Sequence, residues 1–175
     1  MARVLLSDNT LRSAAESGPD AFFNCVVDAI AASVGGELTA DTMEQLSADQ
    51  ITLWAFRMMH EEVMDGGFIQ LIHNGYGEFF FQNPFGKVLK LWGLRDLSKL
   101  VYDARKLFFE FGTEIAAECT DEEFMALYER FPQFDDLDDA FIEGEEEWIQ
   151  QLAFYVDEHL SDFVEIENQA DGKEQ

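Results

Sequence analysis

The middle of the chain contains the sequence Glu62-Val63-Met64-Asp65-Gly66-Gly67-Phe68-Ile69-Gln70-Leu71-Ile72-His73-Asn74-Gly75. Glycine takes positive φ angles without a steric penalty, so the glycine pair allows one helix to end and another to begin within two residues. We expect the phenylalanine to fill the corner, and the amides of Gln70 and Asn74 to bond free backbone groups there. This motif is interpreted as a structural elbow made by Gly66, Gly67, Phe68, Gln70 and Asn74.

The segments on both sides of the elbow have helical spacing. Apolar residues recur every three or four positions, and no segment alternates apolar and polar residues over a length that predicts a strand. The pattern predicts helices over about residues 20–34, 48–65, 68–74, 88–92, 97–111, 121–131 and 136–163. We therefore predict a single all-α domain over residues 1–165, followed by a loose acidic tail over residues 166–175.

The composition is that of a folded and strongly acidic protein. Of the 175 residues, 47% are hydrophobic and 17 are Phe, which excludes a disordered chain. The net charge of −25 repels nucleic acid and anionic lipid, so we expect neither as a direct partner. The apolar run Val4-Leu5-Leu6 is too short for a signal peptide, and we expect a cytoplasmic protein. Cys25 and Cys119 are isolated, which predicts buried thiols or at most one disulfide.

The acidic residues are concentrated in the C-terminal part of the sequence. Residues 1–109 contain 14 acidic and 9 basic residues, whereas residues 110–175 contain 22 acidic residues and two basic ones. The segment before this acidic part holds six of the eleven positive charges, namely Lys87, Lys90, Arg95, Lys99, Arg105 and Lys106. The sequence assigns no role to this basic segment.

Four of the acidic residues are spaced to form one row on the last predicted helix: Asp135, Asp139, Glu143 and Glu147. Helical neighbours at this spacing stand roughly 5–6 Å apart, and phosphates along one DNA strand stand roughly 6–7 Å apart. The row can therefore imitate a phosphate backbone, but it also fits an ordinary solvated helix face. The candidate partner contacts are Asp135, Asp136, Asp138, Asp139, Glu143, Glu146 and Glu147, with a second strip at Glu110, Glu114 and Glu118.

Motifs for catalysis and metal binding are incomplete. His60 lacks the second histidine of a zinc protease helix. A run in the last predicted helix resembles a calcium loop, but Ala140 and Phe141 replace a ligand and the required glycine. An enzyme that uses buried carboxylates needs acidic residues on the apolar stripes of its helices. Only Glu62 and Glu145 lie near such a stripe. We expect no enzymatic activity, no metal site and no cofactor.

The elbow resembles the signature of a bacterial domain-of-unknown-function family, Asn-Gly-Gly-Phe-x-Gln followed by Asn, which includes the DMP-type DNA-mimic protein. Asp65 stands where the family usually has Asn, and the other motif positions match. The resemblance extends over about residues 47–163 and includes the following features: Trp92-Gly93, the acidic run Phe134 to Asp138, Tyr155 and His159.

The resemblance implies an all-helical, dimeric protein whose surface carboxylates imitate DNA phosphates and occupy the DNA-binding face of a transcriptional regulator. Together with the charge of −25 and the helical row, it leads us to predict a DNA mimic that binds a basic DNA-binding protein. Two alternatives stay open: an immunity or anti-nuclease protein that binds a basic toxin, and an acidic interaction domain with no DNA-related partner.

Overall fold

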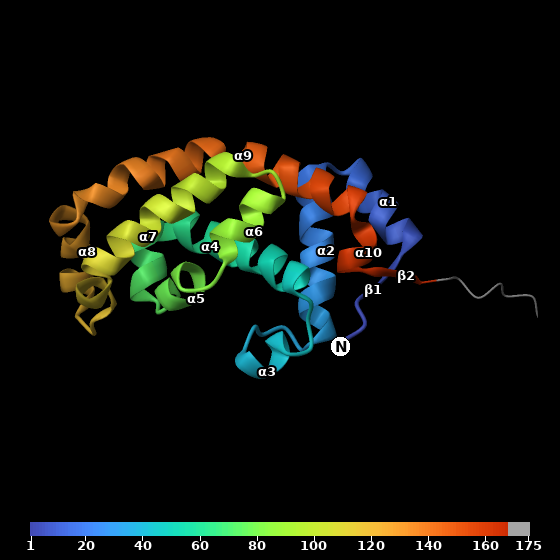
Figure 1. Cartoon of the computed structure of the whole chain (residues 1–175), viewed down its shortest axis with the longest axis horizontal. Coiled ribbons are helices and arrows are strands. Elements are labelled where there is room, and N and C mark those ends of the chain that lie inside the picture. The colour runs from blue at the N-terminus through green and yellow to red at the C-terminus, as the bar shows by residue number, and fades with distance from the viewer. Residues whose placement is uncertain (168–175) are drawn as a thin grey trace, which may run out of the picture. The chain divides into compact units, whose positions relative to one another are not determined.

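A computed structural model of the chain describes residues 1–167 (Figure 1). Within these residues ten α-helices dominate, so the predicted all-α class is confirmed. The helices are α1 (Asp8–Glu16), α2 (Pro19–Ser33), α3 (Ala40–Met43), α4 (Ala48–His73), α5 (Gly77–Phe81), α6 (Phe85–Leu91), α7 (Arg95–Ala116), α8 (Asp121–Arg130), α9 (Asp135–Glu158) and α10 (Leu160–Phe163). The other elements are the strands β1 (Leu5–Ser7) and β2 (Glu165–Glu167) and the 3-10 turn η1 (Pro132–Phe134). The predicted tail beyond residue 167 lies outside the described residues.

The residues group into two compact units. The first unit comprises Met1–Trp54 and the described residues from Ile149 onward, and the second comprises Ala55–Trp148. Both boundaries fall inside helices, one in α4 and one in α9. The single domain over residues 1–165 stays a prediction.

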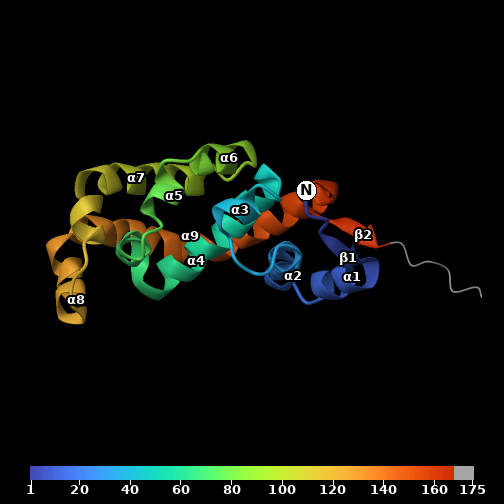
Figure 2. The same cartoon turned by 90° about the horizontal axis from the view of Figure 1, so that it is seen from below.

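The first unit contains a strand pair that the helical periodicity did not indicate. β1 and β2 pair in parallel, with Leu5 opposite Glu165 (Figure 2). The Glu165 N–H donates to the carbonyl of Val4 at 2.7 Å, and Arg3 forms a 2.6 Å ion pair with the Glu165 carboxylate. Residues 166 and 167, which we expected in the loose tail, are therefore paired. Strands of three residues are too short to show a periodic signal in the sequence.

The second unit has a core rich in phenylalanine. Its largest side chains with less than 2% exposure include Phe56, Phe68, Phe80, Phe81, Phe134 and Phe141. Fully burying one such side chain stabilises a fold by about 1.5–3 kcal/mol. The predicted Phe-rich interior is therefore present, and it fixes the helices of this unit relative to one another.

The predicted helix over about residues 97–111 ends too early, because α7 continues through Gly112 to Ala116. A Cβ atom at Gly112 would lie 2.6 Å from the ring of Phe108, closer than real Cβ contacts. The glycine therefore makes room for an aromatic ring inside the helix. This continuation places Glu114 on the helix.

The predicted elbow lies inside α4. Gly66 (φ −148°, ψ 18°) and Gly67 (φ 73°, ψ −177°) interrupt the helical backbone, and helical geometry resumes after them. The positive φ of Gly67 favours glycine. A Cβ atom at Gly67 would also lie 2.4 Å from Oδ2 of Asp138, so the glycine allows α9 to approach the elbow.

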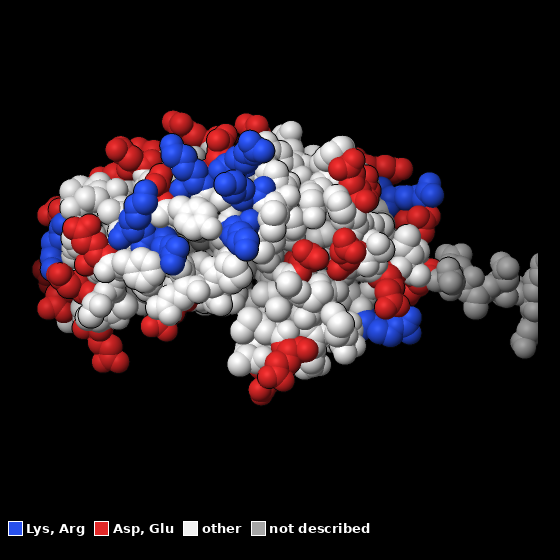
Figure 3. All heavy atoms as spheres, in the orientation of Figure 1, with Lys and Arg blue, Asp and Glu red and all other residues white. Residues whose placement is uncertain are grey.

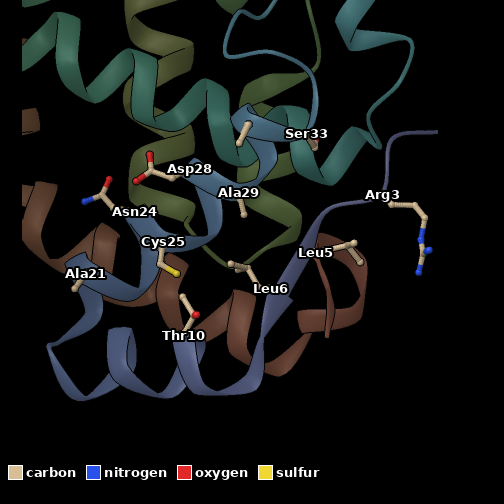
Figure 4. A pocket seen from close by; sticks show the side chains of 11 residues that line it. Arg3, Leu5, Leu6, Thr10, Ala21, Asn24, Cys25, Asp28, Ala29 and Ser33 are labelled. Atoms are coloured by element: carbon tan, nitrogen blue, oxygen red, sulfur yellow. The ribbon is translucent and has the colours of Figure 1, made fainter. Parts of the chain in front are cut away.

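Both cysteines are free thiols. Cys25 is half buried and lines a groove of about 710 Å³ whose other lining residues include Leu6 of β1 and Ala29 of α2 (Figure 4). Burial, followed by the charge of Asp28, raises the pKa of the Cys25 thiol. Cys119 is exposed, so the expected burial is wrong for this residue. Among residues 1–167 no helix is long and apolar enough to cross a membrane.

Candidate functional site

The first half of α9 carries a strip of exposed carboxylates. Its buried side chains Phe141 and Trp148 face the core, and six acidic residues on other faces of the helix are exposed. We define the α9 strip as the exposed residues Asp135, Asp136, Asp139, Glu143, Glu146 and Glu147. Six of the seven carboxylates that we predicted as primary contacts are therefore on the surface of the second unit.

The predicted second strip is only partly helical. Glu110 and Glu114 lie on α7, whereas Glu118 follows the end of that helix. All three are exposed, and Glu114 forms a 2.7 Å ion pair with Arg130. Because this pair neutralises one charge, the second strip offers a partner less negative charge than the sequence indicated.

The helix α8 adds exposed carboxylates that we did not predict as contacts: Asp121, Glu122, Glu123 and Glu129. Three of them lie in the first turn, where the helix dipole stabilises negative charge. Glu123 also accepts a 2.9 Å hydrogen bond from the Thr120 N–H, which completes the capping box. The acidic residues at this position in the sequence are therefore explained by helix capping, which gives no signal of a binding surface.

Asp138 differs from the other predicted contacts because it points into the protein. Its Oδ1 accepts a 2.8 Å hydrogen bond from the backbone N–H of Phe68, which begins the helix after the elbow. Burial raises the pKa of Asp138 to about 6, and the charges of Asp135 and Asp139 act in the same direction, although the bond to Phe68 opposes them. Asp138 therefore caps the second half of α4 from a distance in sequence.

The elbow amides bind carboxylates rather than backbone groups. Nε2 of Gln70 donates to Asp65 Oδ2 at 2.9 Å and to Glu62 Oε2 at 3.2 Å. Nδ2 of Asn74 donates to the same Glu62 oxygen at 2.8 Å. The expectation that these amides satisfy free backbone groups is therefore wrong.

Tyr128, like Asp138, forms a hydrogen bond to the backbone of the elbow. Its hydroxyl donates to the carbonyl of Gly66 at 2.7 Å. Burial, followed by the charges of Asp138 and Asp65, raises the pKa of the Tyr128 hydroxyl. We define the elbow cluster as Glu62, Asp65, Gln70, Asn74, Tyr128 and Asp138. It ties together α4, α8 and α9 within the second unit, so its polar groups hold these helices to one another.

A second internal contact joins the same two long helices. His60 and Glu145 meet at 2.6 Å between Nε2 and Oε2, and both side chains are mostly buried. Within residues 1–167, no three His, Cys, Asp or Glu side chains are grouped to hold a metal ion. The histidine and its carboxylate partner connect α4 and α9 within the second unit.

Exposed apolar side chains interrupt the acidic surface. Ile142 is 51% exposed on α9, between Asp139 and Glu146 at helical spacing. Met125 on α8 is 63% exposed. Neither residue belongs to the predicted contacts, although each is an apolar side chain on the polar face of its helix. Such residues provide apolar contact area on an otherwise charged surface.

Comparison with known proteins places these features in a family. The family described as DMP19-like protein matches residues 44–159 of this chain. The chain belongs to the DMP19-like protein family. A relative from Neisseria meningitidis serogroup B, named DNA mimic protein DMP19, is 33% identical over 135 residues, which cover 74% of this chain and 82% of that protein. The resemblance inferred from the elbow is therefore confirmed.

The matched range includes both the elbow cluster and the α9 strip. It agrees closely with the range of about 47–163 over which the resemblance was recognised. The DMP19-like match thus covers the whole second unit, Ala55–Trp148, together with parts of the first.

Proposed function

We propose that this chain is a DNA mimic without enzymatic activity, which binds a basic DNA-binding protein through the α9 strip and blocks its access to DNA. The observation that carries the proposal is the membership in the DMP19-like family together with a 33% identical relative named as a DNA mimic protein. The partner class that fits best is a transcriptional regulator, whose DNA-binding face is basic and shaped to receive phosphates.

The arrangement of the α9 strip supports this role. Asp135, Asp139, Glu143 and Glu147 are spaced four residues apart on one continuous helix. Neighbours at this spacing stand about 5–6 Å apart, close to the roughly 6–7 Å between phosphates along a DNA strand. A basic protein that accepts a phosphate row can therefore accept this carboxylate row.

The core keeps the row rigid before a partner binds. Phe141 is fully buried beneath the strip, and Asp138 anchors the same helix to the elbow. A rigid row loses little conformational entropy on binding. Exposed Ile142 adds an apolar contact beside the carboxylates. Association with a basic partner is expected to be fast and to weaken as salt rises.

The proposal is tested by affinity capture from cell lysate on the immobilised full chain, followed by elution with duplex DNA. We expect the chain to retain a DNA-binding protein that duplex DNA releases. A variant with Asp135→Asn, Asp139→Asn, Glu143→Gln and Glu147→Gln is expected to lose this protein because the charged row is gone.

The matched control neutralises four exposed carboxylates of the first unit, with Glu16→Gln, Glu37→Gln, Asp41→Asn and Glu44→Gln. It has the same net charge as the α9 variant and is expected to retain the partner. If both variants lose the partner equally, net charge rather than the α9 strip is responsible, and the proposed interface is wrong. If duplex DNA releases nothing, the proposed mimicry is wrong.

A further inference from the structure

A group of positive side chains lies on one face of the second unit. We define the basic patch as Lys87 and Lys90 of α6 with Arg95, Lys99 and Arg105 of α7. Figure 3 shows positive side chains gathered over α6 and α7, while negative ones follow α8 and α9. All five are exposed, and none forms an ion pair with another described residue. Because these five cations form no ion pair within the described residues, they are available to an external anion.

A small cavity opens beside the basic patch. It has a volume of about 250 Å³, and Lys87 and Arg105 line it together with the buried apolar side chains Phe80, Phe81 and Val101. No carboxylate is among its described lining residues. The volume lies just below the roughly 300–1,000 Å³ of drug-sized ligand sites, so it suits a single side chain.

Internal contacts hold the walls of this cavity. The Ser98 hydroxyl, buried on α7, donates to the Gly86 carbonyl of α6 at 2.7 Å. A Cβ atom at Gly86 would lie 3.3 Å from the ring of Tyr102, so α6 and α7 approach closely here. The guanidinium of Arg105 lies 5.1 Å from the centre of the Phe109 ring, within reach of a cation–π interaction. The walls of the cavity and the Arg105 guanidinium are therefore held in place by internal contacts.

We propose that the basic patch binds a short acidic segment of a partner protein, with one apolar or aromatic side chain of that segment seated in the cavity. Carboxylates of the segment pair with the lysines and arginines, and the apolar side chain contacts Phe80 and Phe81. Leu91 of α6, which is 73% exposed, and Tyr102 of α7 extend the apolar contact area. Arg and Tyr are both enriched at protein interfaces.

The net charge favours a short peptide over other anions. Screening at physiological salt limits attraction and repulsion to about 8 Å, so a segment that stays on the patch meets mainly positive charge. A nucleic acid or a lipid surface extends beyond the patch and meets the remaining carboxylates of a chain with net charge −25. Charge complementarity therefore selects an acidic segment of limited length.

This site is independent of the proposed DNA mimicry, because it uses α5, α6 and α7 rather than the α9 strip. It is tested by fluorescence anisotropy of the full chain with a labelled short peptide of aspartate and glutamate around one central phenylalanine. Lys87→Gln with Arg105→Gln is expected to weaken binding by about fivefold or more, since two exposed ion pairs are lost. Replacing the peptide phenylalanine by alanine is also expected to weaken binding.

The matched control is Arg3→Gln with Arg12→Gln, which removes two exposed cations of the first unit and is expected to leave the affinity unchanged. Equal weakening by both double variants would overturn the proposal. Tighter patch-dependent binding of an oligonucleotide or an anionic vesicle would also overturn it. Self-association that Lys87→Gln and Arg105→Gln abolish, seen by sedimentation, would show a second copy as the occupant instead.

Discussion

Asp138 and Asp139 are neighbours in sequence, but one carboxylate is bonded inside the protein and the other is exposed at its surface. Asp139 is exposed on the α9 strip, whereas Asp138 accepts the Phe68 N–H inside the elbow cluster. The elbow cluster uses its carboxylates in hydrogen bonds to the elbow, whereas the carboxylates of the α9 strip are exposed. An acidic binding surface is therefore defined by the exposed carboxylates, and a count of all acidic residues overstates it.

The largest expected effect is on the elbow, at Gly67→Ala. The change forces an L side chain to a φ of 73° and places Cβ against the Asp138 carboxylate. We expect the free energy of unfolding to fall by about 2–4 kcal/mol, from backbone strain and the disturbed Phe68 bond. Urea unfolding measures this. Gly36→Ala, at a φ of 88° with no atom within 4 Å, is the control and should cost only the strain of about 1–2 kcal/mol.

The next comparison is between Asp138→Ala and Asp139→Ala. We expect Asp138→Ala to lower the free energy of unfolding by about 1–2 kcal/mol, because the Phe68 N–H loses its acceptor. Asp139→Ala is expected to change it by less than about 0.5 kcal/mol. Equal losses in urea unfolding at both positions would contradict the division between the elbow cluster and the α9 strip.

A third effect should appear as a pH dependence. The pKa of Asp138 in the folded protein, about 6, lies above its ordinary value of 3.8, so the folded state binds the proton more tightly than the unfolded state. The contribution of Asp138 to stability is therefore fully present below pH 3.8 and falls as pH rises toward 6. Asp138→Asn imitates the protonated form, so the stability of the natural protein should decline relative to this variant across that window.

Asp139→Asn controls for the loss of one negative charge in this experiment. Thermal unfolding at a series of pH values measures the difference between each variant and the natural protein. A constant difference between Asp138→Asn and the natural protein from pH 4 to pH 7 would show that burial does not shift Asp138.

The smallest effect on stability is expected on the α9 strip and has the opposite sign. Neutralising Asp135, Asp139, Glu143 and Glu147 removes three like-charge neighbours and should stabilise α9 by up to about 1 kcal/mol at low salt. The gain should shrink at high salt because exposed charges are screened. Urea unfolding at two salt concentrations checks this, and a loss of stability would show that the row has an internal role.

The helical class and the elbow could be predicted from the sequence because both depend on local patterns. The hydrogen bond of Asp138 inside the protein could not be predicted from the neighbouring residues alone, since its partner Phe68 lies 70 residues away. A signal was present: Asp138 lies four residues after Phe134 and three before Phe141, on the buried stripe. A similar signal was present for the internal pair of His60 and Glu145, because Glu145 precedes buried Trp148 by three residues and so also lies near the buried stripe.

The strand pair and the helix α5 gave no comparable signal. β1 and β2 contain three residues each and are joined only by long-range pairing. The helix α5 is five residues long and mostly aromatic, so it shows no amphipathic period. The basic patch was visible as a charged segment, but the cavity beside it depends on the packing of α6 against α7.

The contacts between residues far apart in the sequence have a consequence for folding during protein synthesis. The elbow bonds Tyr128 and Asp138, which lie 62 and 70 positions after their partners in the sequence. His60 and Glu145 are 85 positions apart, and the Gln50 amide bonds the carbonyl of Phe163. A ribosome adds about 5–20 residues per second, so the elbow waits for seconds before its partners emerge. Neither unit can complete its contacts until nearly the whole chain has been made. A C-terminal truncation before Phe163 would therefore leave β1 and Gln50, at the other end of the sequence, without their partners.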